Sequence, residues 1–162
     1  MTGMGESVAL STVQRLARAE QLRRDGVLVS DWEALSAFER ATYPAMVAAM
    51  ERAGVPTDGR PPVWAWSGVP TPLDITSLLD PEHQLSAGYA LIEFAAPDGL
   101  VFLSDYGSWN DYLAAWFDDP EAVWAPGQPA EFTRLPQACV PYLRGEWVRT
   151  VRPLPTSGWE DV

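Results

Sequence analysis

Lysine is absent from the chain, and cysteine and histidine occur once each. All 11 basic residues among its 162 residues are arginine. Arginine stays protonated, so the chain has no side chain for a Schiff base, a P-loop phosphate contact of the lysine type or a lysine general base. Several classes of enzyme mechanism are therefore excluded.

The single cysteine and the single histidine leave little scope for thiol or imidazole chemistry. Cys139 cannot form an intrachain disulfide, and its Ala-Cys-Val context predicts a buried, unreactive thiol. His83 stands between Glu82 and Gln84, a polar setting typical of an exposed side chain. We therefore expect no metal site and no Ser-His-Asp triad, and the chain has no glycine-rich phosphate loop.

Long hydrophobic runs are also missing. No apolar stretch approaches the roughly 20 residues that a membrane-spanning helix needs, because Glu93, Pro97 and Asp98 interrupt the longest ones. The N-terminus does not have the basic-then-apolar order of a secretory signal. We expect a soluble, cytoplasmic protein without a membrane partner.

Positive charge is scarce, and its distribution is uneven. The chain has 22 acidic residues and a formal net charge of -11. Residues 53–133 contain twelve acidic residues against one cation, Arg60. This balance disfavours nucleic acid as a partner, because phosphates would be repelled. The acidic middle would attract a basic partner, or it is a solvated surface that keeps the protein soluble.

The composition and the local patterns predict one α+β domain over residues 1–162, with a small, mainly antiparallel sheet flanked by helices. Hydrophobic residues make up 47% and charged residues 20%, as in globular domains. Residues 8–14 read as a strand and 15–24 as a helix that ends at Gly26. The Ser30-Asp31-Trp32-Glu33 sequence has the form of a capping box and predicts the start of a second helix.

That second helix is expected to restart near Thr42, because Pro44 disfavours a helix interior, and to end at Gly54. Residues 63–66 alternate as a strand with Trp64 and Trp66 on one face. Residues 89–95 and 100–104, joined by Pro97-Asp98-Gly99, predict a buried hairpin.

Ser108 is the expected N-cap of a helix that stops at Asp119-Pro120. Beyond it, residues 118–145 are rich in proline and predict irregular structure, followed by a late strand over about 146–152.

Several of these segments together resemble a known family. The resemblance rests on Pro62-Val63-Trp64-Ala65-Trp66, Ala90-Leu91-Ile92-Glu93-Phe94 with Pro97-Asp98, Val101-Phe102-Leu103-Ser104-Asp105-Tyr106 and Trp109. Their spacing is similar to that of the bacterial family catalogued as domain of unknown function 3841, over residues of about 7–117. The family usually has a tryptophan before the Thr-x-Gln of the first strand, where this chain has Ser11. The resemblance implies an α+β fold and names no activity.

A weaker likeness points to a cofactor. A first strand with a polar centre, an immediate helix and Gly26-Val27-Leu28 are similar to the entrance of NAD-dependent ADP-ribosyltransferase folds. The likeness implies NAD as cofactor and a late catalytic glutamate, for which Glu146 is the candidate. Those enzymes usually hold NAD with a histidine or arginine in the first strand, where this chain has Ser11, Thr12 and Gln14.

Polar residues inside apolar strands define the candidate site. Glu93 interrupts a central strand, so it is either a structural partner of an arginine or an acid-base group with a shifted pKa. Asp105 is a second candidate catalytic carboxylate or a helix cap. The candidate ligand-binding residues are Thr12, Gln14, Trp64, Trp66, Ser104 and Trp109, although the tryptophans could equally be core.

Two functional hypotheses follow from these residues. The first is a small-molecule site of enzyme type between the first strand and the hairpin. The second is a non-catalytic interaction protein whose acidic middle docks on a basic partner.

Overall fold

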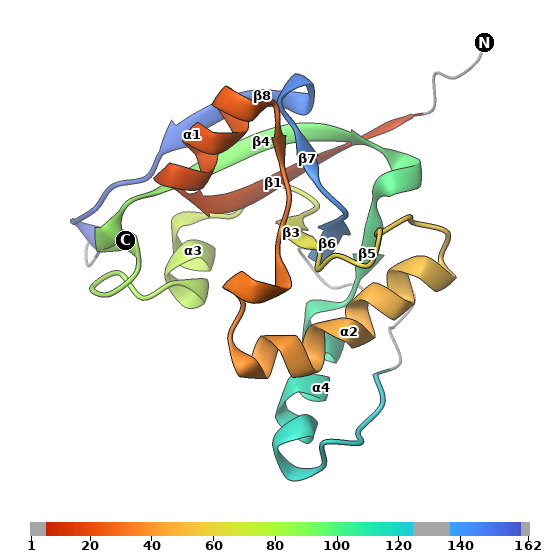
Figure 1. The fold of residues 1–162 in the computed structure, drawn as a ribbon. Helices are drawn as coiled ribbons and strands as arrows, with labels where there is room; N and C mark the ends of the chain where they lie inside the picture. Colours follow the sequence, from red (N-terminus) through yellow and green to blue (C-terminus); the bar gives the residue numbers. More distant parts are fainter. Residues whose placement is uncertain (1–5, 125–136, 160–162) are drawn as a thin grey trace.

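An antiparallel sheet of six strands in the order β5-β6-β3-β1-β4-β8 organises the protein, and a two-stranded sheet, β2-β7, lies beside it (Figure 1). The computed structural model describes residues 6–124 and 137–159. The strands are β1 (Ser7–Arg15), β2 (Val27–Leu28), β3 (Val63–Trp66), β4 (Tyr89–Pro97), β5 (Phe102–Ser104), β6 (Gln137–Val140), β7 (Leu143–Arg144) and β8 (Val148–Pro153). The helices are α1 (Leu16–Asp25), α2 (Ala37–Arg52), α3 (Pro72–Leu78) and α4 (Tyr106–Asp118). The α+β class and the mainly antiparallel sheet are confirmed.

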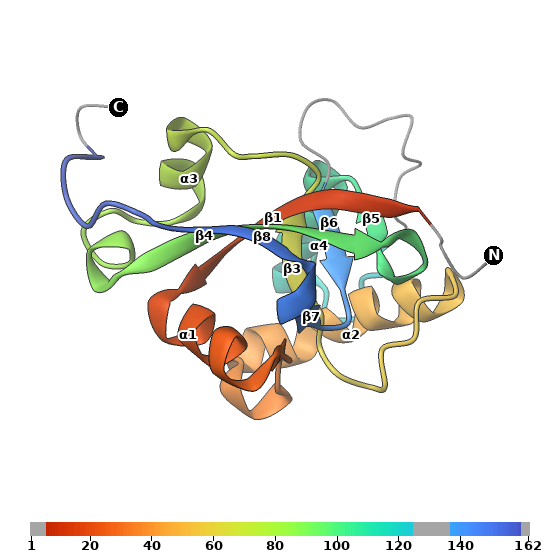
Figure 2. The same ribbon diagram turned by 90° about the horizontal axis from the view of Figure 1, so that it is seen from above.

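The two faces of the main sheet bury different clusters. On one face, here called the α1 face, Leu10, Val63 and Phe94 pack with Leu22 of α1 and with the small sheet. The opposite face, here called the α3 face, is covered at one end by α3 and Trp159 and at the other by α2 and α4. Helices α1 and α3 lie on opposite sides of β4 and β8 (Figure 2). Because both faces of β4 are covered, its sequence is largely apolar and does not alternate between polar and apolar residues.

The first strand and helix follow the sequence patterns closely. Strand β1 pairs along its whole length with β4, from Ser7 opposite Pro97 to Arg15 opposite Tyr89. Helix α1 ends at Gly26, whose φ of 77° is left-handed and whose N–H donates to the carbonyl of Leu22. A residue without a side chain adopts this backbone at least cost, so the predicted C-cap is confirmed.

The predicted start of the second helix is wrong. Residues Trp32–Ala34 form a single 3-10 turn, without a side-chain cap. Helix α2 begins at Ala37, and its N-cap, Ser36, lies six residues after Ser30. The Ser36 hydroxyl accepts from the N–H of Glu39 at 3.1 Å, and the Glu39 carboxylate accepts from the N–H of Ser36 at 2.9 Å. Both segments have the S-x-x-E pattern, and only the second precedes a helix long enough to bury an apolar face.

The predicted restart of that helix near Thr42 is also wrong. Pro44 lies inside a continuous α2 with its side chain exposed. Its missing N–H removes one hydrogen bond from the helix. The helix remains continuous because Met46, Ala49 and Met50 are buried against α4 and the sheet, and this packing outweighs the lost bond.

The predicted hairpin does not form. Strand β4 lies between β1 and β8, whereas β5 lies at the far edge of the sheet beside β6. A 3-10 turn, Asp98–Leu100, leads the chain away from β4. The apolar strands and the Pro-Asp-Gly turn were read correctly, but β1 and β8 occupy both edges of β4 and leave no place for β5.

Three predictions for the second half of the chain are corrected. Asp105, not Ser108, is the N-cap of α4, since its carboxylate accepts from the N–H groups of Gly107 and Ser108 at 3.3 and 3.2 Å. Within 118–145, strands β6 and β7 replace part of the expected irregular structure, and residues 125–136 lie outside the described residues. The late strand begins at Val148, after a 3-10 turn, Gly145–Trp147.

Among residues 6–124 and 137–159, no helix has the length and apolar character needed to cross a membrane.

Candidate functional site

A line of polar side chains crosses the α3 face of the sheet. Each strand contributes one residue, and each residue is the register partner of the next. In strand order these are Ser104, Gln137, Trp66, Ser11, Glu93 and Thr150, here called the polar row. Directly opposed residues in neighbouring strands share a face, so the register brings the predicted residues Ser104, Trp66 and Glu93 into one row.

At the β5 end and in the middle of the polar row, the polar side chains form hydrogen bonds with other groups of the protein. The Gln137 amide donates to the Ser104 hydroxyl at 2.9 Å, and both residues are buried. The buried Ser11 hydroxyl donates to the carbonyl of Gly68. The ring of Trp66 contacts Tyr106 edge to face at 5.1 Å. These groups stabilise the sheet and the segment that follows β3.

The β8 end of the polar row is open. Glu93 is 31% exposed; its carboxylate accepts from the Thr150 hydroxyl at 2.8 Å and lies 3.4 Å from the guanidinium of Arg152. The arginine that was expected as a structural partner of Glu93 is therefore present. Partial exposure of the pair lets water and ligands reach it.

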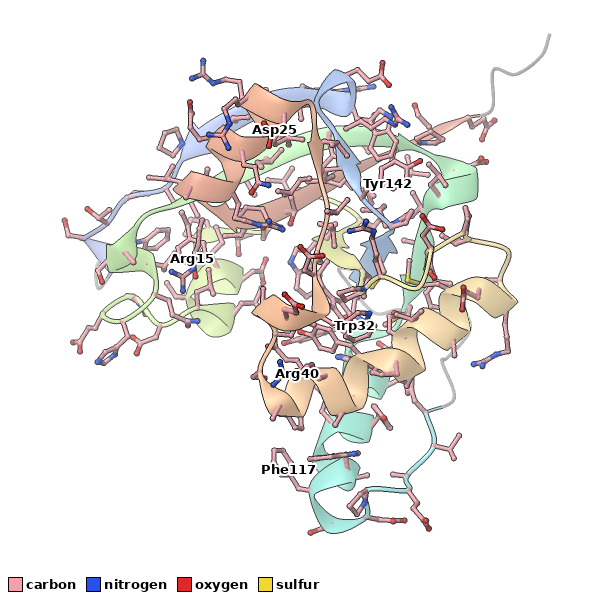
Figure 3. All side chains as sticks on the ribbon, viewed as in Figure 1. Arg15, Asp25, Trp32, Arg40, Phe117 and Tyr142 are labelled. Atoms are coloured by element: carbon pink, nitrogen blue, oxygen red, sulfur yellow. The ribbon has the colours of Figure 1, made fainter. Side chains whose placement is uncertain are left out.

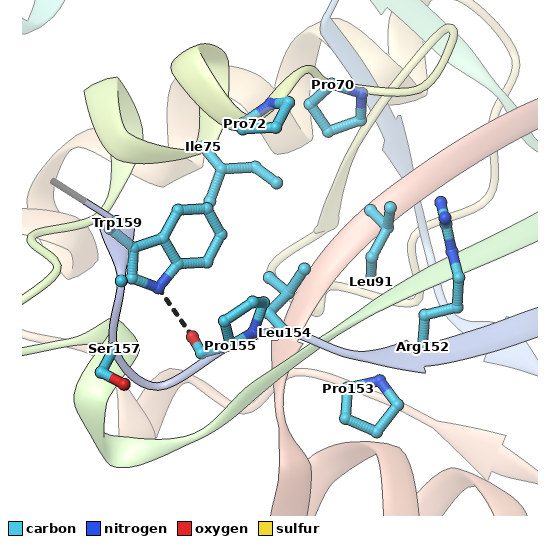
Figure 4. Close-up of a pocket in the computed structure, with 11 residues that line it drawn as sticks. Pro70, Pro72, Ile75, Leu91, Arg152, Pro153, Leu154, Pro155, Ser157 and Trp159 are labelled. Atoms are coloured by element: carbon cyan, nitrogen blue, oxygen red, sulfur yellow. Dashed lines mark hydrogen bonds between the residues drawn. The ribbon is translucent and has the colours of Figure 1, made fainter. Parts of the chain in front are cut away.

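Two hollows flank this ion pair on the α3 face. The larger, of about 370 Å³, is lined by Pro70, Pro72, Ile75, Leu91, Arg152, Pro153, Leu154, Pro155, Ser157, Gly158 and Trp159 (Figure 4). The smaller, of about 250 Å³, is lined by Ala9, Leu10, Gly68, Val69, Glu93, Phe94, Arg149 and Thr150. Residues 68–72 contribute to both, and β4 and β8 form the floor. Together these hollows are here called the Glu93–Arg152 groove.

The larger hollow combines an apolar lining with one cation. Among the described residues that line it, Arg152 alone is charged. Leu91 and Arg152 are register partners on β4 and β8, and both side chains rise toward Pro70 and Ile75 (Figure 4). The indole of Trp159 forms the far wall, and its N–H donates to the carbonyl of Pro155 at 2.7 Å. An aromatic wall with a convergent polar group is typical of a small-molecule pocket.

Thr12 and Gln14 lie on the other side of the sheet. Their register partners, Ile92 and Ala90, face α1. The buried Thr12 hydroxyl donates to the carbonyl of Trp64 at 2.6 Å, and the Gln14 amide donates to that hydroxyl at 3.0 Å. The structure does not bring these two residues into the groove; instead, Thr12 ties β1 to β3.

Trp64 and Trp109 belong to an aromatic cluster under α2 and α4. Their ring centroids are 5.3 Å apart, and Tyr43 lies 5.2 Å from Trp64. Burial, followed by the Glu39 carboxylate that accepts its hydroxyl at 2.9 Å, raises the pKa of Tyr43, which is therefore neutral at physiological pH. The indole N–H of Trp64 is buried and makes no well-aligned hydrogen bond among the described residues, although it faces the Tyr43 hydroxyl closely enough to lower the pKa of that group slightly. These tryptophans are core residues, the second of the two readings of the sequence.

The other predicted carboxylates lie apart from Glu93. Asp105 caps α4, which is the second of the two roles that the sequence suggests for it. Glu146 lies on the 3-10 turn before β8, with 73% of its side chain exposed and 3.9 Å from Arg144. The structure does not gather Glu93, Asp105 and Glu146 in one pocket.

His83 and Cys139 occupy the positions that the sequence predicts. The imidazole of His83 is exposed and lies 2.6 Å from the Asp80 carboxylate. The thiol of Cys139 is completely buried, and burial raises its pKa. In the described part of the chain, no three histidine, cysteine, aspartate or glutamate side chains gather closely enough to hold a metal ion.

Arg152 and Trp159, which complete the groove, were missed by the sequence reading. Both follow or end the late strand, where prolines at 153 and 155 indicate only an irregular segment. The alternation of Thr150 and Arg152 on one face of β8 is a signal that could have paired them with Glu93. Such a pairing depends on the register between β4 and β8, and no local sequence pattern predicts that register.

Comparisons of the chain with models of protein families, with curated proteins and with solved structures gave no match. The function is therefore argued from the groove itself.

Proposed function

We propose that the protein binds a small anionic molecule with an apolar part in the Glu93–Arg152 groove. The observation that carries this proposal is the apolar hollow of about 370 Å³, in which a guanidinium is the one charged group among the described lining residues. The volume lies within the range of small-molecule sites, about 300–1,000 Å³. The apolar part of the ligand would contact Trp159 and Ile75, and its carboxylate or phosphate would contact Arg152.

The charges around the groove favour an anion. Among the described residues, Arg149 and Arg152 line it together with one carboxylate, Glu93, which leaves an excess of one positive charge. A guanidinium has five N–H donors in a planar fork, and the contact with Glu93 uses one edge of it. Glu93 therefore orients Arg152 and leaves donors for the ligand.

The proposal concerns binding and not a reaction. The Glu93 carboxylate accepts from the Thr150 hydroxyl, but a carboxylate is a weak base toward an alcohol. An ADP-ribosyltransferase reaction through Glu146 stays a prediction for which the geometry offers no support. NAD belongs among the ligands to be tested, because it joins a pyrophosphate to two aromatic bases.

The first experiment measures thermal unfolding of the protein with a panel of aromatic and aliphatic carboxylates, sugar phosphates, nucleotides and NAD. A ligand at 100 times its dissociation constant adds about 2.7 kcal/mol, which raises the midpoint by several degrees. Titration calorimetry then compares Arg152→Gln with Arg24→Gln, an exposed arginine on α1. Loss of a charge-assisted hydrogen bond costs about 1.5–3 kcal/mol, so the first variant should bind at least about tenfold more weakly.

Binding that survives both Arg152→Gln and Trp159→Leu unchanged would place the ligand elsewhere and contradict the proposal. The Arg24→Gln variant should bind as the parent does, because its guanidinium contacts Asp25 and does not line the groove.

The second hypothesis, an interaction protein whose acidic middle docks on a basic partner, also remains a proposal. The observation that favours it is the acidic middle of the chain, where residues 53–133 contain twelve acidic residues against one cation. A cytoplasmic setting is part of both proposals and is supported by the lone, fully buried Cys139, since reduced cysteine is ordinary in that compartment.

A further inference from the structure

Glu93 lies beside the guanidinium that would bind the ligand. Its carboxylate is 3.4 Å from Arg152, and both side chains reach solvent, since Glu93 is partly exposed and the Arg152 side chain is 59% exposed. An anion bound at the free edge of this guanidinium therefore comes close to a fixed negative charge. Like charges brought together at a binding site are costly, so Glu93 limits the charge that a ligand can carry.

The described residues that line the groove supply an excess of one positive charge. Arg152 belongs to the larger hollow, whereas Arg149 and Glu93 belong to the smaller one. Arg15, at the end of β1 (Figure 3), has its guanidinium over the ring of Tyr89, 5.8 Å from the centroid, and is not among the lining residues. One negative charge on a ligand balances the excess, and a second would remain uncompensated beside an apolar wall.

The start of α3, which borders the larger hollow, does not provide a phosphate site. Pro72 lines the hollow and has no N–H. The N–H of Asp74 donates to the Thr71 hydroxyl at 3.1 Å, and the Asp74 carboxylate accepts from the N–H of Thr71 at 2.9 Å. This capping box uses donors that could otherwise contact a phosphate, and it adds a negative charge at this end of the helix.

We infer that the ligand of the Glu93–Arg152 groove is a monocarboxylate and not a phosphate ester, and that Glu93 selects between the two. This inference rests on the proposed function, because it assigns the class of anion that binds at Arg152. At pH 7 a carboxylic acid carries one negative charge, whereas a phosphate monoester carries about 1.5–2. The two oxygens of a carboxylate match two N–H donors of a guanidinium, so a monocarboxylate binds Arg152 without bringing a second charge close to Glu93.

Titration calorimetry at pH 7 with a matched pair of ligands tests the inference. Naphthylacetate and naphthyl phosphate, substituted at the same ring position, share a ring system that would contact Trp159, and each attaches its anion through one atom. The unaltered protein should bind the carboxylate at least about tenfold more tightly, because the phosphate brings an uncompensated charge close to Glu93. Arg152→Gln should weaken the binding of both ligands, which places them in the groove.

Glu93→Gln tests the charge of this residue while keeping its shape. The amide oxygen can still accept from the Thr150 hydroxyl, but the groove then has an excess of two positive charges. The preference for the carboxylate, measured as the ratio of the two dissociation constants, should fall at least about fivefold. A looser Arg152 would weaken both ligands alike and leave this ratio unchanged.

The matched control is Glu146→Gln. This substitution removes the same charge from an exposed carboxylate that lies 3.9 Å from an arginine, Arg144, and that is not among the described residues lining the groove. The preference for the carboxylate should stay as it is in the parent.

Equal or tighter binding of the phosphate by the parent overturns the inference, and so does a preference that Glu93→Gln leaves unchanged. In both cases weaker binding by Arg152→Gln would show that the proposed function still holds. Failure of both naphthyl ligands to bind overturns the inference as well. The thermal-unfolding panel then decides the proposed function: a ligand of another class that depends on Arg152 supports it, and the absence of any ligand overturns both.

Discussion

Thr12 shows how a polar residue inside an apolar strand can serve the fold instead of a ligand. Its hydroxyl is buried, donates to the carbonyl of Trp64 and accepts from the Gln14 amide. In Thr12→Val the carbonyl and the amide lose this partner, so we expect the free energy of unfolding to fall by about 1–2 kcal/mol, measured by urea denaturation. Thr150→Val is the control, since its hydroxyl is exposed, and should cost less than about 0.5 kcal/mol. Equal effects of the two substitutions would contradict a structural role specific to Thr12.

Glu39 links the stability of the protein to pH. Burial raises the pKa of this carboxyl, but hydrogen bonds from the Ser36 N–H and the Tyr43 hydroxyl outweigh burial and leave the pKa below its usual range. A carboxyl with a lowered folded-state pKa stabilises the fold above its unfolded-state pKa, and this contribution disappears as the pH falls through the folded-state value.

We therefore expect Glu39→Gln to lower the free energy of unfolding by about 0.5 kcal/mol at pH 7, a modest effect because the site is partly exposed. Below pH 4 the difference from the parent should shrink toward zero. Urea denaturation at several pH values measures it, and a difference that stays constant down to pH 3 would rule out the ionised carboxylate as its source.

At the scale of single elements, α2 offers a direct comparison of two candidate caps. Ser30 and Ser36 both begin an S-x-x-E sequence, but only Ser36 caps a helix. Ser36→Ala should lower the free energy of unfolding by about 1 kcal/mol, because the N–H of Glu39 loses its acceptor. Ser30→Ala should change it by less than about 0.5 kcal/mol. Chemical denaturation of both variants is sufficient, and a larger loss for Ser30→Ala would contradict the observed helix start.

The misplaced hairpin and the misplaced helix start have a common origin. Turn residues and caps indicate where an element begins or ends. The boundaries that they predict for α1, β3 and β4 agree with the observed ones to within a few residues. Strand pairing depends on contacts between distant residues, such as Glu93 with Thr150 and Ser104 with Gln137. The Pro-Asp-Gly turn between β4 and β5 favours their pairing locally, and no local pattern indicates that β1 is the neighbour of β4 instead.

At the scale of the whole molecule, Cys139 reports on global opening. It lies on β6, between β3 and β5, with its thiol completely buried beside Trp109 and Met50. A thiol in this position reacts only after the sheet opens, and burial also keeps it protonated. We expect negligible labelling by a thiol reagent under native conditions and complete labelling in denaturant. Rapid native labelling would show that the edge strand β5 and its neighbour β6 open separately from the rest of the sheet.

As with the fold, the sequence predicts one part of the candidate site and not the rest. Glu93 could be found from the sequence because a carboxylate inside an apolar strand needs a compensating group, and the structure supplies Arg152 and Thr150. The groove beside it could not be found, because its walls come from residues 68–72 and from the end of the chain near Trp159. Thr12, Gln14, Trp64 and Trp109 were candidates on chemical type alone, and their neighbours decide that they are structural.

The sequence by itself determined the α+β class, the β1-α1 unit with its Gly26 cap, the single face of Trp64 and Trp66, and the burial of Cys139. These features depend on periodicity, backbone preference and hydrophobicity, which act over a few residues. The tertiary structure alone decided the order of the strands, the partner of Glu93 and the apolar hollow beside Arg152. Each of these depends on which distant residues lie together. The free energy of the whole core decides that arrangement, and the sequence of one short segment is not sufficient to predict it.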